Sequence, residues 1–409
     1  MAETRIEDLC AWLDSSPTPF HVVDTASRRL EAAGFRSHSS LADGIAESGY
    51  LAVDGALIAW RGPTAGPMRI IGAHTDSPNL RVQPVPDIRN AGWSQLGVEI
   101  YGGVLLNSWL DRDLGIAGRV LDRSGRAHLF NVTAPIARVP QLAIHLDREI
   151  NDRGLLLDRF AHTSPVWGTG APDFSSWLSD VTGVVDIAAF DAHLHDITPA
   201  TLLGVDASLL ASARLDNQLS CWAAVSAIVD APFTRTSIVV LNDHEEVGSE
   251  SVTGAAGPML EQLVAVIIES RGLGAGARRD LLSTSWCLSA DNAHAVHPNY
   301  PERHDPRHGP RPNAGPALKL NGNQRYATSA RGAAHIRSVA ATARVPLQTF
   351  VSRNNVPCGS TIGPITATRL GIEAIDVGVP QLSMHSAREL CGADDPAHLV
   401  SLMSAFLAA

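Results

Sequence analysis

What the sequence lacks excludes several large classes of protein. No apolar run approaches the roughly 20 residues that a helix needs to cross a bilayer, and the first residues lack the basic start and apolar run of a secretory signal. The formal net charge is −10, so we expect no basic stripe of the kind that binds nucleic acid. We therefore expect a soluble protein with no membrane and no nucleic-acid partner.

Cysteine is scarce and its spacing carries no motif. The five residues stand far apart, without a C-x-x-C pair: Cys10, Cys221, Cys287, Cys358 and Cys391. This spacing suggests neither a disulfide framework nor a cysteine metal site, so we expect a reducing compartment, the cytoplasm. What is present is a chain of 409 residues, 45% of them hydrophobic, which is enough for two domains or for one domain with an insertion.

Short apolar runs end at or near polar residues in four places: 68–74, 237–242, 284–290 and 372–379. Buried strands that end in this way are typical of an α/β sheet that gathers its site at the strand ends. Helical patterns are predicted for MAETRIEDLCAWL at the start and for about 215–230, 257–271, 330–343 and 395–408.

The segment 86–212 has a different texture, with short β-like runs separated by turn residues. These runs are LGVEIYG, GIAGRVL, AHLFNV and QLAIHL. They predict an inserted β-rich domain, so that the α/β domain is discontinuous and comprises residues 1–85 and 213–409.

His74 and Asp76 stand two residues apart at the end of the first apolar run. In extended backbone both side chains point to the same side, so the imidazole could bind a metal while the carboxylate orients it; a hydrogen-bonded turn is the alternative. Asp216 stands where a helix should begin. It could be an ordinary N-cap, or a carboxylate that bridges two divalent cations about 3.5–4 Å apart.

Two adjacent acids, Glu245 and Glu246, follow the second apolar run. Solvated glutamates in a surface turn are the alternative, but one could bind a metal while its neighbour holds the attacking water and moves its proton. Asp291 follows the third run and His385 the fourth. The whole set offers two histidines, two aspartates and one glutamate as ligands for two zinc-like ions, with one glutamate left as a base.

A series of motifs in this order resembles the M18 metallopeptidases, the aspartyl aminopeptidase family: SPTPFHVV, GAHTDSPNL, LNSWLDRDLG, ARLDNQLS, DHEEVGS, ADNAHAVHPNY, QRYATS, GSTIGP and SMHSARE. The match spans essentially the whole chain. It implies a discontinuous α/β/α metallopeptidase domain with a central mixed sheet, an inserted β-rich dimerisation domain, and a homo-oligomer, a dodecamer built from dimers.

The resemblance also implies a role for each site residue. The metal ligands would be His74, Asp216, Glu246, Asp291 and His385, with Asp216 as the bridge between two divalent ions, expected to be Zn²⁺. Glu245 would be the general base, and Asp76 would fix the ring of His74.

Three further residues are candidates for substrate binding. The resemblance places His297 across a subunit interface, where it could stabilise the substrate carbonyl, and His145 could approach a partner's site similarly; a structural hydrogen bond is the alternative for each. Lys319 could pair with an acidic side chain at the substrate N-terminus, and an exposed lysine beside a strand is the alternative.

The predicted function is a two-metal aminopeptidase that removes single residues, preferentially Asp or Glu, from peptides with a free N-terminus. Two other classes stay open at this stage. The same metal chemistry would serve a zinc hydrolase of acylated amino acids or small amides, and a non-catalytic assembly scaffold is the third hypothesis.

Overall fold

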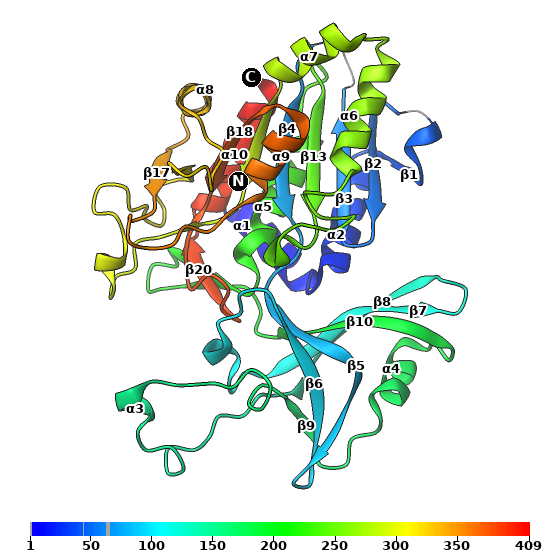
Figure 1. Cartoon of the computed structure of the whole chain (residues 1–409), viewed down its shortest axis with the longest axis vertical. Coiled ribbons are helices and arrows are strands. Elements are labelled where there is room, and N and C mark those ends of the chain that lie inside the picture. Colours follow the sequence, from blue (N-terminus) through cyan, green and yellow to red (C-terminus); the bar gives the residue numbers. More distant parts are fainter. Residues whose placement is uncertain (1, 44, 63–65) are drawn as a thin grey trace. The chain divides into compact units, whose positions relative to one another are not determined.

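The structure, a computed structural model, describes residues 2–43, 45–62 and 66–409, which form two compact units (Figure 1). The α/β unit comprises Met1–Asp76, Ala200–Met384 and Glu389–Ala409. The insertion unit comprises Ser77–Pro199 and His385–Arg388. The sequence pattern placed the insertion at 86–212, and its role in dimerisation stays a prediction.

A mixed sheet of nine strands forms the centre of the described α/β unit. In spatial order the strands are β1 (Arg36–His38), β2 (Ser48–Val53), β3 (Ala56–Arg61), β13 (Ser237–Asn242), β4 (Arg69–His74), β14 (Trp286–Ala290), β18 (Glu373–Gly378), β16 (Ala317–Leu320) and β17 (Gln348–Val351). The four strands from β13 to β18 are mutually parallel, whereas β3 and β16 run antiparallel to their inner neighbours.

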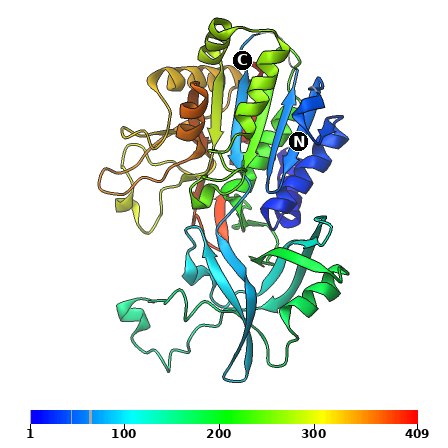
Figure 2. The same cartoon turned by 45° about the vertical axis from the view of Figure 1, so that its right-hand side comes forward.

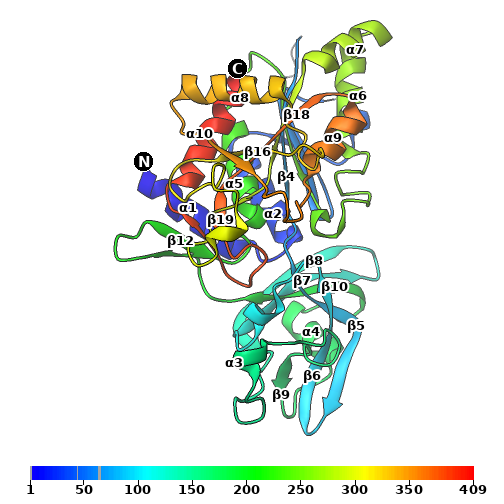
Figure 3. The same cartoon turned by 60° about the vertical axis from the view of Figure 1, so that its left-hand side comes forward.

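Alternate residues of the central strands point to opposite faces, and both faces are covered by helices. Ile71 of β4 packs with one group of helices: α1 (Ala2–Ser15), α2 (Pro19–Ala32), α5 (Leu215–Val229), α8 (Ala330–Ala343) and α10 (Asp395–Ala408). Ile70 packs with the other group: α6 (Met259–Ser270), α7 (Ala275–Thr284) and α9 (Ile362–Leu370). Figure 3 shows the sheet nearly edge-on between α5, α8 and α10 on its left and α6 and α9 on its right. The predicted α/β/α arrangement is confirmed.

The predicted elements of the α/β unit agree closely with the observed ones. All four apolar runs are strands that end within two residues of the predicted end, and all four predicted internal helices are present. The predicted N-terminal helix is α1, although Met1 lies outside the described residues. Sequence reasoning did not find α2, α7 and α9, each of which contains glycine, proline or polar residues that weaken a helical pattern.

The parallel order of the central strands brings distant polar residues to one edge of the sheet. His74 ends β4, Asp243 follows β13, and Asp291 follows β14. Because β4 lies between β13 and β14, their carboxyl ends are neighbours. A smaller sheet lies in the same unit: β11 (Thr201–Leu203), β12 (Leu209–Ser212), β20 (Glu389–Gly392), β19 (Pro380–Leu382) and β15 (Ala293–His294).

The insertion unit is built on an antiparallel sheet of six strands. Their spatial order is β8 (Ala127–Ala137), β7 (Leu114–Asp122), β10 (Ile187–Asp196), β5 (Asn79–Asn90), β6 (Trp93–Tyr101) and β9 (Val166–Gly168). Figure 2 shows β5 and β6 as a long hairpin, in cyan. Helix α4 (Phe174–Thr182) supplies Phe174 and Leu178 to the core of this unit.

One strand prediction in the insertion is wrong. The run QLAIHL, residues 141–146, has the alternation of a strand but forms coil and a turn, followed by the short helix α3 (Ile150–Arg153). Leu142, Ile144 and Leu146 are exposed, and the run joins none of the sheets of the described residues. Alternation fixes a strand only where a neighbouring strand takes up its backbone hydrogen bonds.

Within the described segments, no helix has both the length and the apolar character needed to cross a bilayer.

Gly378 offers a test of how closely the end of β18 packs against the backbone of Asp291. It ends β18, and a β-carbon there would collide with the backbone carbonyl oxygen of Asp291. We expect Gly378→Ala to lower the free energy of unfolding by about 1–3 kcal/mol, the usual cost of overpacking, and to lower the melting temperature. Gly276→Ala in α7, where a β-carbon meets nothing within 4 Å, is the control and should not lower it. Equal melting temperatures for Gly378→Ala and the parent would contradict the close approach.

Candidate metal centre

His74 is buried at the carboxyl end of β4, and its ring orientation is fixed from one side. Nδ1 lies 3.1 Å from the carbonyl oxygen of Asp76. Because a carbonyl only accepts, Nδ1 carries a hydrogen, and in the neutral ring the lone pair is on Nε2. Nε2 faces Oδ1 of Asp216 at 3.5 Å and Oδ1 of Asp291 at 3.7 Å. This is the tautomer that a histidine needs to bind a metal through Nε2.

Asp76 connects this strand end to the loop after β13. Its carboxylate is fully buried and lies 3.4 Å from Nδ1 of His74. It also accepts hydrogen bonds from the backbone amides of Glu245 and Glu246, each at 3.1 Å. The two glutamates begin the 3₁₀ helix η3 (Glu245–Val247). Sequence reasoning considered Asp76 only as a partner of His74 and did not find its hydrogen bonds with the backbone amides of Glu245 and Glu246.

Asp216 does not lie in regular helix. Its φ of −84° and ψ of 106° depart from helical values near the start of α5, and its peptide bond to Asn217 is cis. The backbone amide of Asp216 donates to the buried carboxylate of Glu389 at 2.9 Å. The backbone around Asp216 is therefore held by contacts outside its own helix.

The fold brings four of the candidate ligands together, and we call them the ligand cluster: His74, Asp216, Glu246 and Asp291. One ligand atom from each of His74, Asp216 and Glu246 lies within 4.8 Å of the others. Oδ1 of Asp291 joins them through its 3.7 Å approach to His74.

Charge crowding changes the proton affinities of this region. Burial lowers the pKa of His74, but the carboxylates of Asp216, Asp291 and Asp76 outweigh it and raise the pKa well above 6.5. Burial raises the pKa of Glu245 to about 7, with His74 opposing the shift and the neighbouring aspartates adding to it. Burial therefore acts on the two groups in opposite directions, whereas the neighbouring aspartates raise both pKa values.

The chemistry of the donors fits a divalent cation. One neutral imidazole nitrogen and several carboxylate oxygens are the ligands that zinc takes at catalytic sites. Buried carboxylates that repel one another are stabilised when a cation lies between them. A cation there would also favour the charged form of Glu245 and the neutral form of His74.

Lys319 lies in β16 with its side chain buried, so it is not an exposed lysine beside a strand. Its ammonium contacts the carboxylate of Asp291 and the carbonyl oxygens of Asp291 and Asn292. To pair with an acidic substrate, as the sequence predicts, the ammonium would have to give up at least one of these contacts.

His385 and His145 both lie in the insertion unit. Nδ1 of His385 donates to the carbonyl oxygen of Gly103 at 3.1 Å, which leaves its Nε2 as the lone-pair nitrogen. His145 is exposed, in the turn that replaces the predicted strand. The role of His385 as a ligand and that of His145 near a partner's site stay predictions.

His297 lies in the loop after β15 and makes local contacts. Its backbone amide donates to Nε2 of His304 at 3.1 Å, and its Nδ1 accepts from the backbone amide of Asn299 at 3.2 Å. Its ring also packs against Tyr300. With His294 and Arg303 it lines a surface cavity of about 400 Å³. The loop thus presents a half-buried imidazole beside an open cavity.

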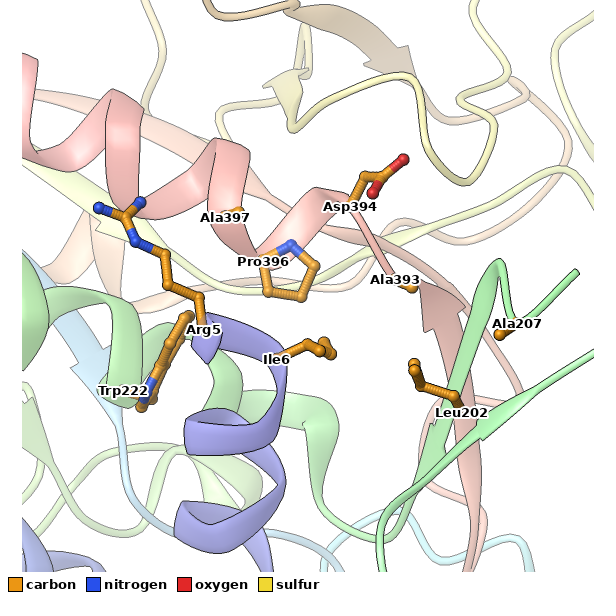
Figure 4. Close-up of a pocket in the computed structure, with 9 residues that line it drawn as sticks. All are labelled: Arg5, Ile6, Leu202, Ala207, Trp222, Ala393, Asp394, Pro396 and Ala397. Atoms are coloured by element: carbon orange, nitrogen blue, oxygen red, sulfur yellow. The ribbon is translucent and has the colours of Figure 1, made fainter. Parts of the chain in front are cut away.

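A separate cavity of about 170 Å³ lies where α1, α5 and the start of α10 meet (Figure 4). Ile6, Trp222 and Pro396 form its apolar wall, and Arg5 and Asp394 stand at its margin. None of its lining residues belongs to the ligand cluster.

Comparison with known sequences identifies relatives along the whole chain. The family described as "Aminopeptidase I zinc metalloprotease (M18)" matches residues 12–407. A protein of Streptomyces coelicolor named "Probable M18 family aminopeptidase 2" is 48% identical, over 98% of this chain and 97% of its own. A protein of Mycobacterium bovis with the same name is 45% identical, over 98% of this chain and 97% of its own.

Solved structures agree with this assignment. A chain from the cryo-EM structure of the Ape4 and Nbr1 complex is 32% identical, with a TM-score of 0.93 over 99% of this chain and 86% of that chain. The mApe1 of Chaetomium thermophilum is 28% identical, with a TM-score of 0.88 over 100% of this chain and 98% of that chain. The resemblance seen in the sequence motifs is confirmed: the chain belongs to the M18 family of zinc metalloproteases and is a metallo-aminopeptidase.

Proposed function

We propose that this metallo-aminopeptidase uses two Zn²⁺ ions to cleave the first peptide bond of peptides with a free N-terminus, with a preference for N-terminal Asp or Glu. The observation that carries the two-metal proposal is the ligand cluster, in which Asp216 lies beside His74 with Glu246 and Asp291 close by. Asp216 would bridge the ions, and His385 would complete the second site. Two bound ions would supply Lewis-acid polarisation of the substrate carbonyl and lower the pKa of the attacking water.

Glu245 is the residue that we assign to proton transfer. It is adjacent in sequence to the proposed ligand Glu246, and the amides of both are held by Asp76. In this position its carboxylate would accept a proton from the attacking water and return it to the amine that leaves. Burial raises the pKa of Glu245, whereas a bound cation would favour its charged form, which is the form that accepts a proton from water.

The alternative substrates are acylated amino acids or small amides, because the proposed metal chemistry does not itself require a free amine. Hydrolysis of matched peptides with free and acetylated N-termini separates the two functions. Cleavage of the acetylated peptides alone would contradict the proposed requirement for a free N-terminus. The scaffold hypothesis loses its support, because the chain is a metallo-aminopeptidase.

The acidic preference is tested with a panel of peptides that differ only in the N-terminal residue. We expect higher kcat/KM for Asp and Glu than for Leu or Ala. Equal kcat/KM for peptides with neutral and acidic N-terminal residues would contradict the proposed acidic preference.

A location in the cytoplasm stays a prediction, and it is supported by five cysteines that are all free.

We also propose a homo-oligomer, specifically a dodecamer built from dimers. One solved relative is the S. cerevisiae mApe1 dodecamer, which is 28% identical with a TM-score of 0.83 over 98% of this chain and 95% of that chain. In the insertion unit, large apolar side chains are exposed along residues 142–160: Leu142, Ile144, Leu146, Leu155, Leu156 and Phe160. An exposed apolar stretch of this kind marks a surface for another protein chain.

Substitution of the two adjacent glutamates is expected to change different properties of the protein, kcat alone for Glu245 and also metal content for Glu246. Glu245→Gln should keep its bound metal and lose about 10²–10⁴-fold in kcat, because it removes the proton acceptor and leaves the ligands in place. Glu246→Gln should also lower the metal content of the purified protein. Metal analysis and steady-state kinetics measure both effects. Near-normal turnover by metal-loaded Glu245→Gln would contradict the assignment of the base.

Metal affinity should fall as the pH falls. The pKa of His74 is raised above 6.5, so below that raised pKa a proton must leave the ring before Nε2 can bind a metal. We expect the affinity for Zn²⁺ to drop by up to about tenfold per pH unit for each proton displaced. Competition with a chelator at several pH values gives the affinity, and calorimetry in buffers of different ionisation enthalpy counts the protons. Binding that is independent of pH and releases no proton would contradict the role of His74.

His297 is expected to act in the site of a neighbouring subunit. Inactive Glu245→Gln subunits are mixed with inactive His297→Ala subunits after reversible dissociation. If His297 acts between subunits, some mixed interfaces combine an intact base with an intact His297, and activity should reappear. Homogeneous assemblies of each variant, taken through the same cycle, are the controls. Verified mixed assembly without recovery would indicate a role within one subunit.

A further inference from the structure

Lys319 is unusual in this chain both for what it is and for where it lies. It is the only lysine in the sequence. The chain has 32 Lys and Arg residues in total, and all the others are arginine. Its side chain is 2% exposed, although a lysine is rarely buried unless its charge is paired. We therefore ask which contacts of this buried side chain an ammonium group can make and a guanidinium group cannot.

The contacts of the ammonium answer that question. Nζ donates to the carbonyl oxygens of Asp291 and Asn292, each at 2.9 Å, and to Oδ2 of Asp291 at 3.2 Å. An ammonium group has three hydrogens, so these three acceptors use its full donor capacity. The ring of Tyr326 lies 4.9 Å from Nζ and adds a cation–π contact. A planar guanidinium could not converge on three such acceptors from one point.

The same contacts fix the orientation of Asp291. Lys319 holds Oδ2 of the carboxylate, while Oδ1 lies 3.7 Å from Nε2 of His74 in the ligand cluster. The two oxygens of Asp291 therefore have different partners. The ammonium also brings positive charge to the buried carboxylates that surround His74.

We propose that Lys319 is a positioning residue for the metal centre: it holds Asp291 so that Oδ1 faces His74 in the ligand cluster, and it offsets part of the negative charge of the ligands. This inference rests on the proposed function of the ligand cluster as a metal site. It assigns Lys319 a role that does not depend on the side chain of the substrate. It therefore differs from the charge-reading role predicted from the sequence.

The first experiment compares Lys319→Met with the parent protein and with Leu320→Met, a control on the same strand. Zn²⁺ affinity is measured by competition with a chelator, and kcat/KM is measured on peptides with N-terminal Asp and N-terminal Leu. We expect Lys319→Met to lose about 10–100-fold in metal affinity, the usual effect of removing a partner of a metal ligand. At limiting Zn²⁺, the losses for Asp and Leu peptides should be equal. Leu320→Met should resemble the parent in all three measurements.

Two outcomes would overturn the inference while leaving the proposed function intact. One is unchanged metal affinity in Lys319→Met when the parent protein binds Zn²⁺. The other is a loss confined to the Asp peptide, which would show that the lysine reads the substrate charge. If the parent protein bound no divalent metal, the proposed function and this inference would both be wrong.

A second experiment needs no substitution, so it covers the case in which Lys319→Met fails to fold. Because the chain has one lysine, an amine-reactive acylating reagent has a single side-chain target, which mass spectrometry follows separately from the N-terminal amine. If the contact of Lys319 with Asp291 favours metal binding, bound metal must favour that contact by the same factor. We expect Zn²⁺ to slow acylation of Lys319 by about 10–100-fold relative to the metal-free protein. Equal rates with and without Zn²⁺ would overturn the inference.

Discussion

The buried carboxylate of Asp76 is the interaction on which the arrangement of the site depends. It lies against Nδ1 of His74 and accepts the backbone amides of Glu245 and Glu246, so one side chain joins the ends of two neighbouring strands. A fully buried carboxylate is costly unless its oxygens are hydrogen-bonded, and these amides provide two of the bonds that it needs. The imidazole and the glutamate pair are thereby placed by the same group.

The wider site follows from one rule of sheet geometry. The parallel strands β13, β4 and β14 end at the same edge, so residues that are far apart in sequence become neighbours. Each of these strands is covered on both faces by helices, which excludes water from the sheet and leaves its carboxyl edge as the place where polar groups can gather. Burial at this edge raises the pKa of Glu245, and the carboxylates around His74 stabilise its protonated form and raise its pKa.

Much of this could be predicted from the sequence because the signals are local. A short apolar run that ends in polar residues identifies a strand end, and this pattern anticipated the proximity of His74, Glu246 and Asp291. Asp216 was found differently, as an acid at the expected start of a helix. The burial of Lys319 was not predictable in the same way. In ALKL, a lysine between two leucines suggests a strand with one exposed face, but Ala317, Leu318 and Lys319 are all buried, so both faces of β16 are covered. The strand prediction for QLAIHL was wrong because alternation of apolar and polar residues does not show whether a partner strand exists.

The order of the strands also bears on how the chain folds. Strands β3 and β4 are close in sequence but are separated in the sheet by β13, which begins at Ser237. The central sheet therefore cannot be completed until the insertion has been synthesised and β13 has followed it. The insertion sheet needs only residues between Asn79 and Asp196, so it can form while the larger sheet is still incomplete. During synthesis, the edges of β3 and β4 that later pair with β13 stay open over this interval, and an open strand edge can pair with a wrong partner.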